Sequence, residues 1–135
     1  MGSLYKLKGF TNKLKEILSP YEEIDTKSEG CIFYSEVPAK VIIEISKKVP
    51  KENLEDRENN SPSFKDFVEI AKKYPYTKFE CYIITDKRDD ERITINGIYI
   101  PPVDMKLIEE IRKKQLAPPE EDFITESGYR LLWWD

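Results

Sequence analysis

The chain has 135 residues, of which 39% are hydrophobic and 36% are charged, so it can build one domain with a core under a strongly ionic surface. Its net charge of −4 gives no overall attraction for nucleic acid, and its apolar runs are too short to span a bilayer. The chain contains no His, which excludes catalysis by a Ser/His or Cys/His pair and metal binding by imidazole.

The first predicted element is a helix over residues 11–18, where Leu14, Ile17 and Leu18 share one face and Pro20 follows. Lysines are concentrated around its start, before the first acidic residue of the chain: Lys6, Lys8, Lys13 and Lys15. Such a cluster could contact phosphate groups, although a solvated face is the more ordinary interpretation on an acidic protein. The N-terminus does not resemble a signal peptide, so we expect a cytoplasmic protein.

Residues 31–37 and 41–45 predict a β-hairpin. Apolar side chains alternate in both stretches, with Val41, Ile43 and Ile45 on one face of the second, and "VPAK" supplies the turn. The polar stretch 47–60 that follows predicts a surface loop.

The clearest helix predicted by the sequence begins near Ser61 and Pro62 and ends before Pro75. Its apolar residues repeat at intervals of three and four and form one buried stripe: Phe64, Phe67, Val68 and Ala71. A strand follows over residues 78–86, with apolar side chains on both faces, which favours a central position in the sheet.

A second hairpin is predicted in "RITINGIYI", because Asn96-Gly97 lies between alternating isoleucines. The charged tip before it contains four acids: Asp86, Asp89, Asp90 and Glu91. Their oxygens could hold Mg²⁺ or Ca²⁺, but the spacing lacks the regularity of a calcium loop, and a solvated turn is the ordinary interpretation.

A third helix is predicted after Asp104, with Leu107, Ile108 and Ile111 buried, and Pro118 ends it. An acidic link over residues 119–127 then leads to a strand at "GYRLLWW".

Alternation gives this last strand two apolar faces. One face would carry Tyr129, Leu131 and Trp133, and the other would carry Arg130, Leu132 and Trp134. We expect Trp133 to lie in the core. Leu132 and Trp134 would then need cover from a helix, from a second subunit or from a partner that takes up the tail as a peptide, and with Tyr129 and Arg130 they are the predicted interface residues.

Cys31 and Cys81 each lie in an apolar, strand-like stretch, which predicts two buried free thiols, with a disulfide between neighbouring strands as the alternative. The surface is rich in Lys and Glu and contains a single Gln, a composition typical of hyperthermophile proteins with ion-pair networks.

Together these patterns predict one compact α+β domain over residues 1–135, with a mostly antiparallel sheet of two hairpins plus a C-terminal strand, packed by about three helices. The functional prediction is a non-enzymatic protein that binds a macromolecule, another protein or its own copy. The alternatives are a nucleic-acid-binding regulator that uses the lysine-rich segment and a carboxylate-dependent metal enzyme that uses the acidic tip. The sequence predicts no catalytic residue, metal ligand, cofactor, small-molecule ligand or membrane contact.

Overall fold

Five strands form a single antiparallel sheet. They are β1 (Cys31–Pro38), β2 (Lys78–Ile84), β3 (Arg92–Ile100), β4 (Glu121–Ile124) and β5 (Arg130–Trp133). Their order in the sheet is β1-β2-β3-β5-β4, and every neighbouring pair is antiparallel. The long strands β2 and β3 are therefore central, whereas β1 and the short β4 form the two edges.

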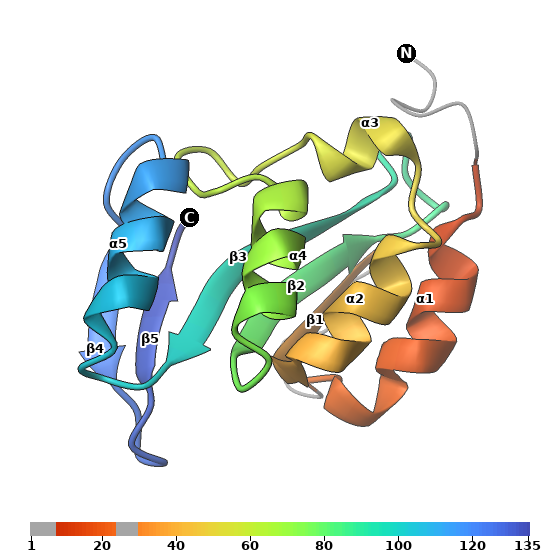
Figure 1. The fold of residues 1–135 in the computed structure, drawn as a ribbon. Helices are drawn as coiled ribbons and strands as arrows, with labels where there is room; N and C mark the ends of the chain where they lie inside the picture. The colour runs from red at the N-terminus through yellow and green to blue at the C-terminus, as the bar shows by residue number, and fades with distance from the viewer. Residues whose placement is uncertain (1–7, 24–29) are drawn as a thin grey trace.

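The longer helices all lie on one face of this sheet (Figure 1). The structure, a computed structural model, describes residues 8–23 and 30–135. Its helical elements are α1 (Thr11–Leu18), η1 (Ser19–Tyr21), α2 (Ala39–Ser46), α3 (Lys51–Leu54), α4 (Phe64–Lys73) and α5 (Met105–Lys114). The predicted α+β class is confirmed, although the helices outnumber the three expected. Within the described ranges, no helix has the length and apolarity needed to cross a membrane.

The main core lies between the helices and the sheet, and α4 is at its centre. Ser63 and Asp66 form a capping box at the start of α4, which fixes where the helix begins. The ring of Phe67 packs edge-on against Phe79 of β2 and Trp134, with centroids 5.9 and 6.1 Å apart. The apolar stripe predicted for this helix is thus the stripe that covers the sheet.

The second half of the first predicted hairpin is a helix, so that prediction is wrong. In α2 the buried side chains are Val41, Ile42 and Ile45, which share one helical face, whereas the prediction was based on the alternation of Val41, Ile43 and Ile45. Pro38 has an extended backbone and separates β1 from α2. Packing of α2 against α1 and α4 overrides the β propensity of its branched residues.

The second predicted hairpin is also wrong, because β3 continues through Asn96-Gly97 without a turn. A β-bulge lies here, opposite Glu80 of β2. Gly97 pairs with Trp133 of β5, and a Cβ at Gly97 would lie 3.2 Å from Glu80 Cβ and 3.4 Å from Leu132 O. Glycine therefore permits a close approach of three strands. The hairpins of the structure join β2 to β3 and β4 to β5.

Two predicted loops contain regular structure. The stretch 47–60 includes α3, where the fully buried Asn53 accepts a hydrogen bond from Ile93 N at 3.0 Å and donates one to Ile93 O at 2.9 Å. This amide pairs with an edge of β3 that β5 does not reach, because β5 pairs only with Gly97 and later residues of β3. The acidic link 119–127 contains β4, whose four residues are all exposed.

Candidate functional site

The C-terminal strand is turned the opposite way from the prediction. Trp134 is fully buried on the helix side: its backbone N donates to Asn96 O at 2.8 Å and its indole Nε1 donates to Ala117 O at 3.1 Å. Leu132 lies in the same core. The chain itself buries these two predicted interface residues. The terminal residues form a strand and not a free peptide. Trp133, expected in the core, is only half-buried on the other face.

The other two predicted interface residues have partners within the chain. Arg130 forms a two-pronged ion pair with Asp122 of β4, with both nitrogen–oxygen distances at 2.7 Å. This pairing lowers the pKa of Asp122 and raises that of Arg130. The Tyr129 ring lies beneath the Lys78 ammonium, 5.2 Å from the nitrogen to the ring centroid. Both contacts hold β4 and β5 onto the sheet.

The face of the sheet opposite the helices carries apolar, aromatic, polar and charged side chains, and we call it the open face. It is formed by the residues that alternate with the core positions along the strands: Cys31, Phe33, Ser35, Lys78, Glu80, Tyr82, Ile84, Arg92, Thr94, Tyr99, Glu121, Phe123, Tyr129, Leu131 and Trp133. Among the described residues, no helix packs on it (Figure 1).

One end of the open face is covered by polar side chains of the same chain. The Tyr82 hydroxyl donates to the Glu58 carboxylate, and the Arg92 guanidinium lies 5.8 Å from the centre of the Tyr82 ring. Tyr82 and its neighbour Ile84 are accordingly buried. The middle and the β4 side of the face are more open. Phe33, whose ring centroid lies 5.8 Å from that of Tyr82, is half-buried, as is Trp133, and 48% of Phe123 is exposed, although Tyr99 and Leu131 beside them are buried.

A small pocket lies in the more open part of this face, and we call it the acidic pocket. Its volume is about 150 Å³, and its lining includes Glu23, Phe33, Glu80, Asn96 and Trp133. Two aromatic rings and two carboxylates thus surround one concave site. The described lining residues include no lysine or arginine.

Glu80 is the central acid of the acidic pocket. Its Oε1 accepts a hydrogen bond from the Tyr99 hydroxyl at 3.0 Å, and that hydroxyl also lies 3.0 Å from Ser35 Oγ. Burial raises the pKa of Glu80 despite the hydrogen bonds from Tyr99 and Ser35, and the neighbouring Glu23 carboxylate raises it further. Glu23 lines the same pocket, so two carboxylates lie at one site.

The Trp133 ring is held in place beside these acids. In the amide orientation that satisfies both of its groups, Asn96 Oδ1 accepts from Trp133 Nε1 at 3.1 Å, and Asn96 Nδ2 donates to Glu80 O at 3.2 Å. The β-bulge at Asn96 therefore orients the aromatic wall of the acidic pocket.

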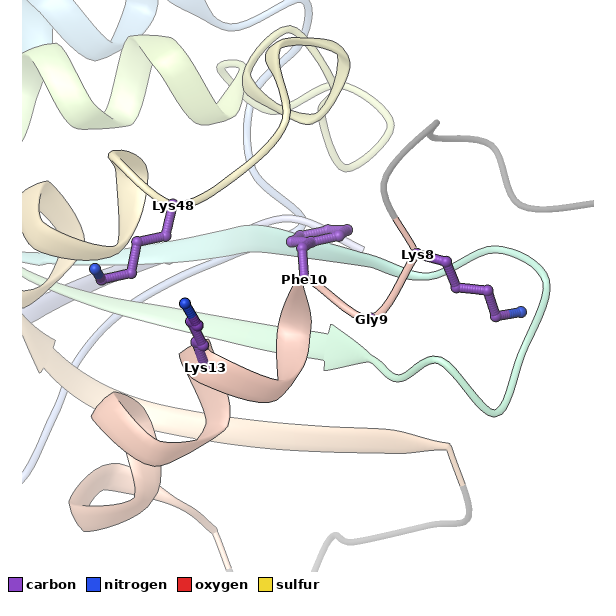
Figure 2. A pocket seen from close by; sticks show the side chains of 5 residues that line it. All are labelled: Lys8, Gly9, Phe10, Lys13 and Lys48. Carbon is purple, nitrogen blue, oxygen red and sulfur yellow. The ribbon is translucent and has the colours of Figure 1, made fainter.

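The predicted lysine cluster forms part of a second, larger pocket. This lysine pocket has a volume of about 380 Å³ and is lined by Lys8, Gly9, Phe10, Lys13 and Lys48. Figure 2 shows Lys13 and Lys48 on the same side of Phe10, with Lys8 directed away from them. Of the other candidates, Lys15 is half-buried on α1 and Lys6 lies outside the described residues.

The acidic tip between β2 and β3 is occupied by contacts within the chain. Glu91 is fully buried, and its carboxylate accepts hydrogen bonds from Gly9 N at 2.7 Å, Thr11 N at 3.1 Å and Thr11 Oγ1 at 2.7 Å. Asp90 pairs with Arg88 at 3.1 Å and with Arg92 at 2.8 Å. In the part of the chain that the structure describes, no three acidic or cysteine side chains come together as a metal site.

Glu91 also occupies the start of α1. Backbone N–H groups at a helix start attract anions, and here the buried carboxylate takes that position. The lysine pocket therefore depends on its side chains alone for any affinity for anions.

The two cysteines are free and buried, as predicted from the sequence, and they do not form the alternative disulfide. Cys31 lies on the open face and pairs in register with Ile84, whereas Cys81 lies in the main core opposite Tyr34. Burial raises the pKa of both thiols.

Comparison of the chain with protein-family models, curated proteins and solved structures gives no match. The candidate function consequently depends on the geometry of the open face and its pocket. Sequence reasoning missed Phe33, Glu80 and Phe123 as site residues. The usable signal was the two-faced apolar pattern of the strands, which implies one face for the helices and one for something else.

Proposed function

We propose that this protein acts without catalysis, by binding another protein through the open face of its sheet. The observation that carries the proposal is the aromatic part of this face, formed by Phe33, Trp133 and Phe123, on the side of the sheet away from the helices. Aromatic residues are enriched in protein interfaces, so half-buried and exposed aromatic side chains on one face favour a binding role for that face.

The β4 edge of the sheet is a poorer docking site than the open face. β4 has only four residues and begins with Glu121 and Asp122, so its exposed backbone is short and flanked by charge. Short, charged edge strands disfavour the addition of a further strand. A partner is therefore expected to lie across the open face.

The test places a photo-crosslinking amino acid at Phe123 on the open face or at Lys65 on the exposed side of α4. We expect the Phe123 probe to capture a discrete partner from a lysate of the source cells and the Lys65 probe not to do so. The captured partner is then purified, and its binding is measured by calorimetry. Trp133→Ala should weaken binding by tenfold or more, as for a buried interface aromatic, whereas Val103→Ala, at an exposed apolar site elsewhere, should not.

Equal capture by both probes, or equal affinity of the two variants, would contradict the proposal. A crosslinked product of twice the chain mass, formed with the purified protein alone, would identify the partner as a second copy. Circular dichroism of Trp133→Ala checks that the variant is folded.

A second candidate function is nucleic-acid binding through the lysine pocket, favoured by the convergence of Lys13 and Lys48 beside Phe10 (Figure 2). Its test is the salt dependence of binding to fluorescent RNA and DNA. Each lost phosphate contact should reduce the slope of log K against log salt by about 0.7–0.9. The double change Lys13→Glu and Lys48→Glu should abolish binding that Lys65→Glu preserves.

A further inference from the structure

The lysine pocket brings two positive charges together from separate parts of the chain. Lys13 lies near the start of α1 and Lys48 lies in the turn that follows α2, and both line the pocket. Figure 2 shows their side chains extending into the same space beside Phe10, whereas Lys8 is directed away. A concave site lined by charges of one sign attracts ions of the other sign, so this pocket favours an anion.

Neither lysine is neutralised by the described part of the chain. Acids are near in the sequence, at Glu16 and Glu44, yet the ion pairs among the described residues involve other side chains. The described lining of the pocket contains no acidic residue. The two ammonium groups therefore have no counter-ion within the described residues and can bind an anion from outside the chain.

The wall of the pocket is fixed by the fold. Gly9 lines the pocket, and its backbone N donates to the buried Glu91 carboxylate at 2.7 Å. Thr11, the first residue of the helix that carries Lys13, donates to the same carboxylate from its backbone N at 3.1 Å. The backbone beside the pocket is thus in place before a ligand arrives, which reduces the ordering cost of binding.

The charge and the size of the site indicate a phosphate monoester. Near pH 7 such a group carries a charge of about −1.5 to −2, which two ammonium groups balance, whereas each phosphate of a nucleic-acid backbone carries about −1. Lysine binds phosphate as a point charge. The volume of about 380 Å³ lies near the lower end of the roughly 300–1,000 Å³ of sites that enclose a small molecule. It admits a phosphate together with a small organic group.

We propose that the lysine pocket binds a phosphate monoester group, with the Lys13 and Lys48 ammonium groups donating hydrogen bonds to its oxygens. Two sources carry this group: a small phosphorylated molecule and the 5′-phosphate end of a nucleic acid. The inference concerns the pocket of the second candidate function and is independent of the open face. It differs from that candidate function because it requires a terminal phosphate and not a continuous backbone.

The first test titrates the protein with phenyl phosphate and follows the backbone amide signals by NMR. The signals of Gly9 and Lys13 should shift with a dissociation constant on the order of 1 mM, and the signal of Lys65 on α4 should stay.

Phenyl sulfate is the matched ligand, since it has a similar shape and a single negative charge. Phenyl phosphate should bind at least fivefold more tightly than phenyl sulfate at pH 7. It should lose this advantage at pH 5, where the phosphate becomes mainly a monoanion because its second pKa is about 6. Equal binding of the two ligands at pH 7 would overturn the proposal.

Variants locate the site. Lys13→Gln and Lys48→Gln should each weaken phenyl phosphate binding by fivefold or more, because each removes one of the two charges. Lys65→Gln, which changes an exposed lysine on α4, should leave binding unchanged. Both pocket lysines are exposed, so the variants should fold, and circular dichroism checks this. Unchanged binding in either pocket variant would overturn the assignment of the site to these two lysines.

Two RNA hexamers of one sequence, with a 5′-phosphate or a 5′-hydroxyl end, distinguish the sources. Tighter binding of the phosphorylated hexamer would support the inference and identify a nucleic-acid end as a source. Binding of phenyl phosphate without binding of either hexamer would support a small phosphorylated molecule and contradict the second candidate function. Equal binding of the two hexamers without binding of phenyl phosphate would overturn the inference and leave the second candidate function standing.

Discussion

At the scale of single residues, the buried carboxylate of Glu91 and the half-buried carboxylate of Glu80 differ in their surroundings. Glu91 is satisfied by three donors at the start of α1, whereas Glu80 shares its pocket with a second acid. Loss of the first should therefore destabilise the protein, and neutralisation of the second should not. Each expectation is open to measurement.

Replacement of Glu91 by alanine should lower the free energy of unfolding by about 2–4 kcal/mol, because Gly9 N, Thr11 N and Thr11 Oγ1 would lose their acceptor in a buried place. Urea denaturation followed by circular dichroism measures the change. The neighbouring exposed Asp89 provides the control, and Asp89→Ala should change stability by no more than about 0.5 kcal/mol. A Glu91→Ala protein as stable as this control would show that the hydrogen bonds are not formed.

Glu80→Gln should raise the free energy of unfolding at pH 7. Burial and the Glu23 carboxylate raise the pKa of Glu80 in the folded protein, so the folded state binds this proton more tightly than the unfolded chain. The wild type consequently loses stability as the pH rises through the two pKa values, and the Gln variant does not. The difference between them should be largest at pH 7 and shrink as the pH falls through the raised pKa of Glu80.

Urea denaturation at several pH values between 4 and 7 tests this expectation, with Glu44→Gln as the exposed control. A variant less stable than the wild type at pH 7, or a difference that does not depend on pH, would contradict it.

At the scale of elements, the small helix α3 has a larger structural role than its four residues suggest. Asn53 supplies both a donor and an acceptor to the backbone of Ile93, in place of a neighbouring strand. Its side chain thus closes the part of the β3 edge that β5 leaves open.

Asn53→Ala should lower the free energy of unfolding by about 2–3 kcal/mol, because it leaves the N–H and the carbonyl of Ile93 unpaired. Hydrogen exchange at the Ile93 amide should accelerate by more than that of β2 amides. The exposed Asn60 gives the matched control, since Asn60→Ala removes the same amide from a surface position. Uniform acceleration across the sheet would indicate general loss of stability instead of local loss at this edge.

The elements that the sequence predicted well are those in which propensity and burial agree. In α4 the apolar spacing and the final proline agree with the observed helix, although Ser63 caps it and it begins at Phe64, two residues after the start predicted at Ser61 and Pro62. In α2 the branched residues favour a strand, and only packing against other helices makes them helical. Gly97 shows a different limit of prediction from sequence. A glycine that permits close contact between strands has the same sequence signature as a glycine in a turn.

The candidate site was less predictable than the fold. Which face of β5 meets the helices depends on register, and a shift of one residue exchanges Trp133 with Trp134. The sequence offered two equally apolar faces and no means of choosing between them. The acidic pocket joins residues from separate strands with Glu23, so its composition follows only from the strand order.

At the scale of the whole molecule, the protein has one covered and one open sheet face, and its two thiols lie on different sides. Cys81 lies in the main core and Cys31 on the open face, and burial raises the pKa of both. Because the thiolate is the reactive form, both thiols should resist alkylation in the native protein.

Pulsed alkylation with iodoacetamide along a urea series, read by mass spectrometry, tests this expectation. Cys81 should become labelled only with global unfolding, whereas Cys31, the first residue of β1, should become labelled at lower urea through local opening. Labelling of Cys81 before the unfolding transition would contradict its place in the core. Tris-carboxyethyl phosphine should not change the melting temperature, because both cysteines are free.

The contact between Glu91 and α1 has a consequence for the order in which the molecule folds. The ribosome makes α1 first, yet the carboxylate that completes its first turn follows 80 residues later. Helices this short are marginal alone, so α1 should dock late, after β2 and β3 have paired. Changes at Glu91 should then accelerate unfolding and leave the folding rate nearly unaltered.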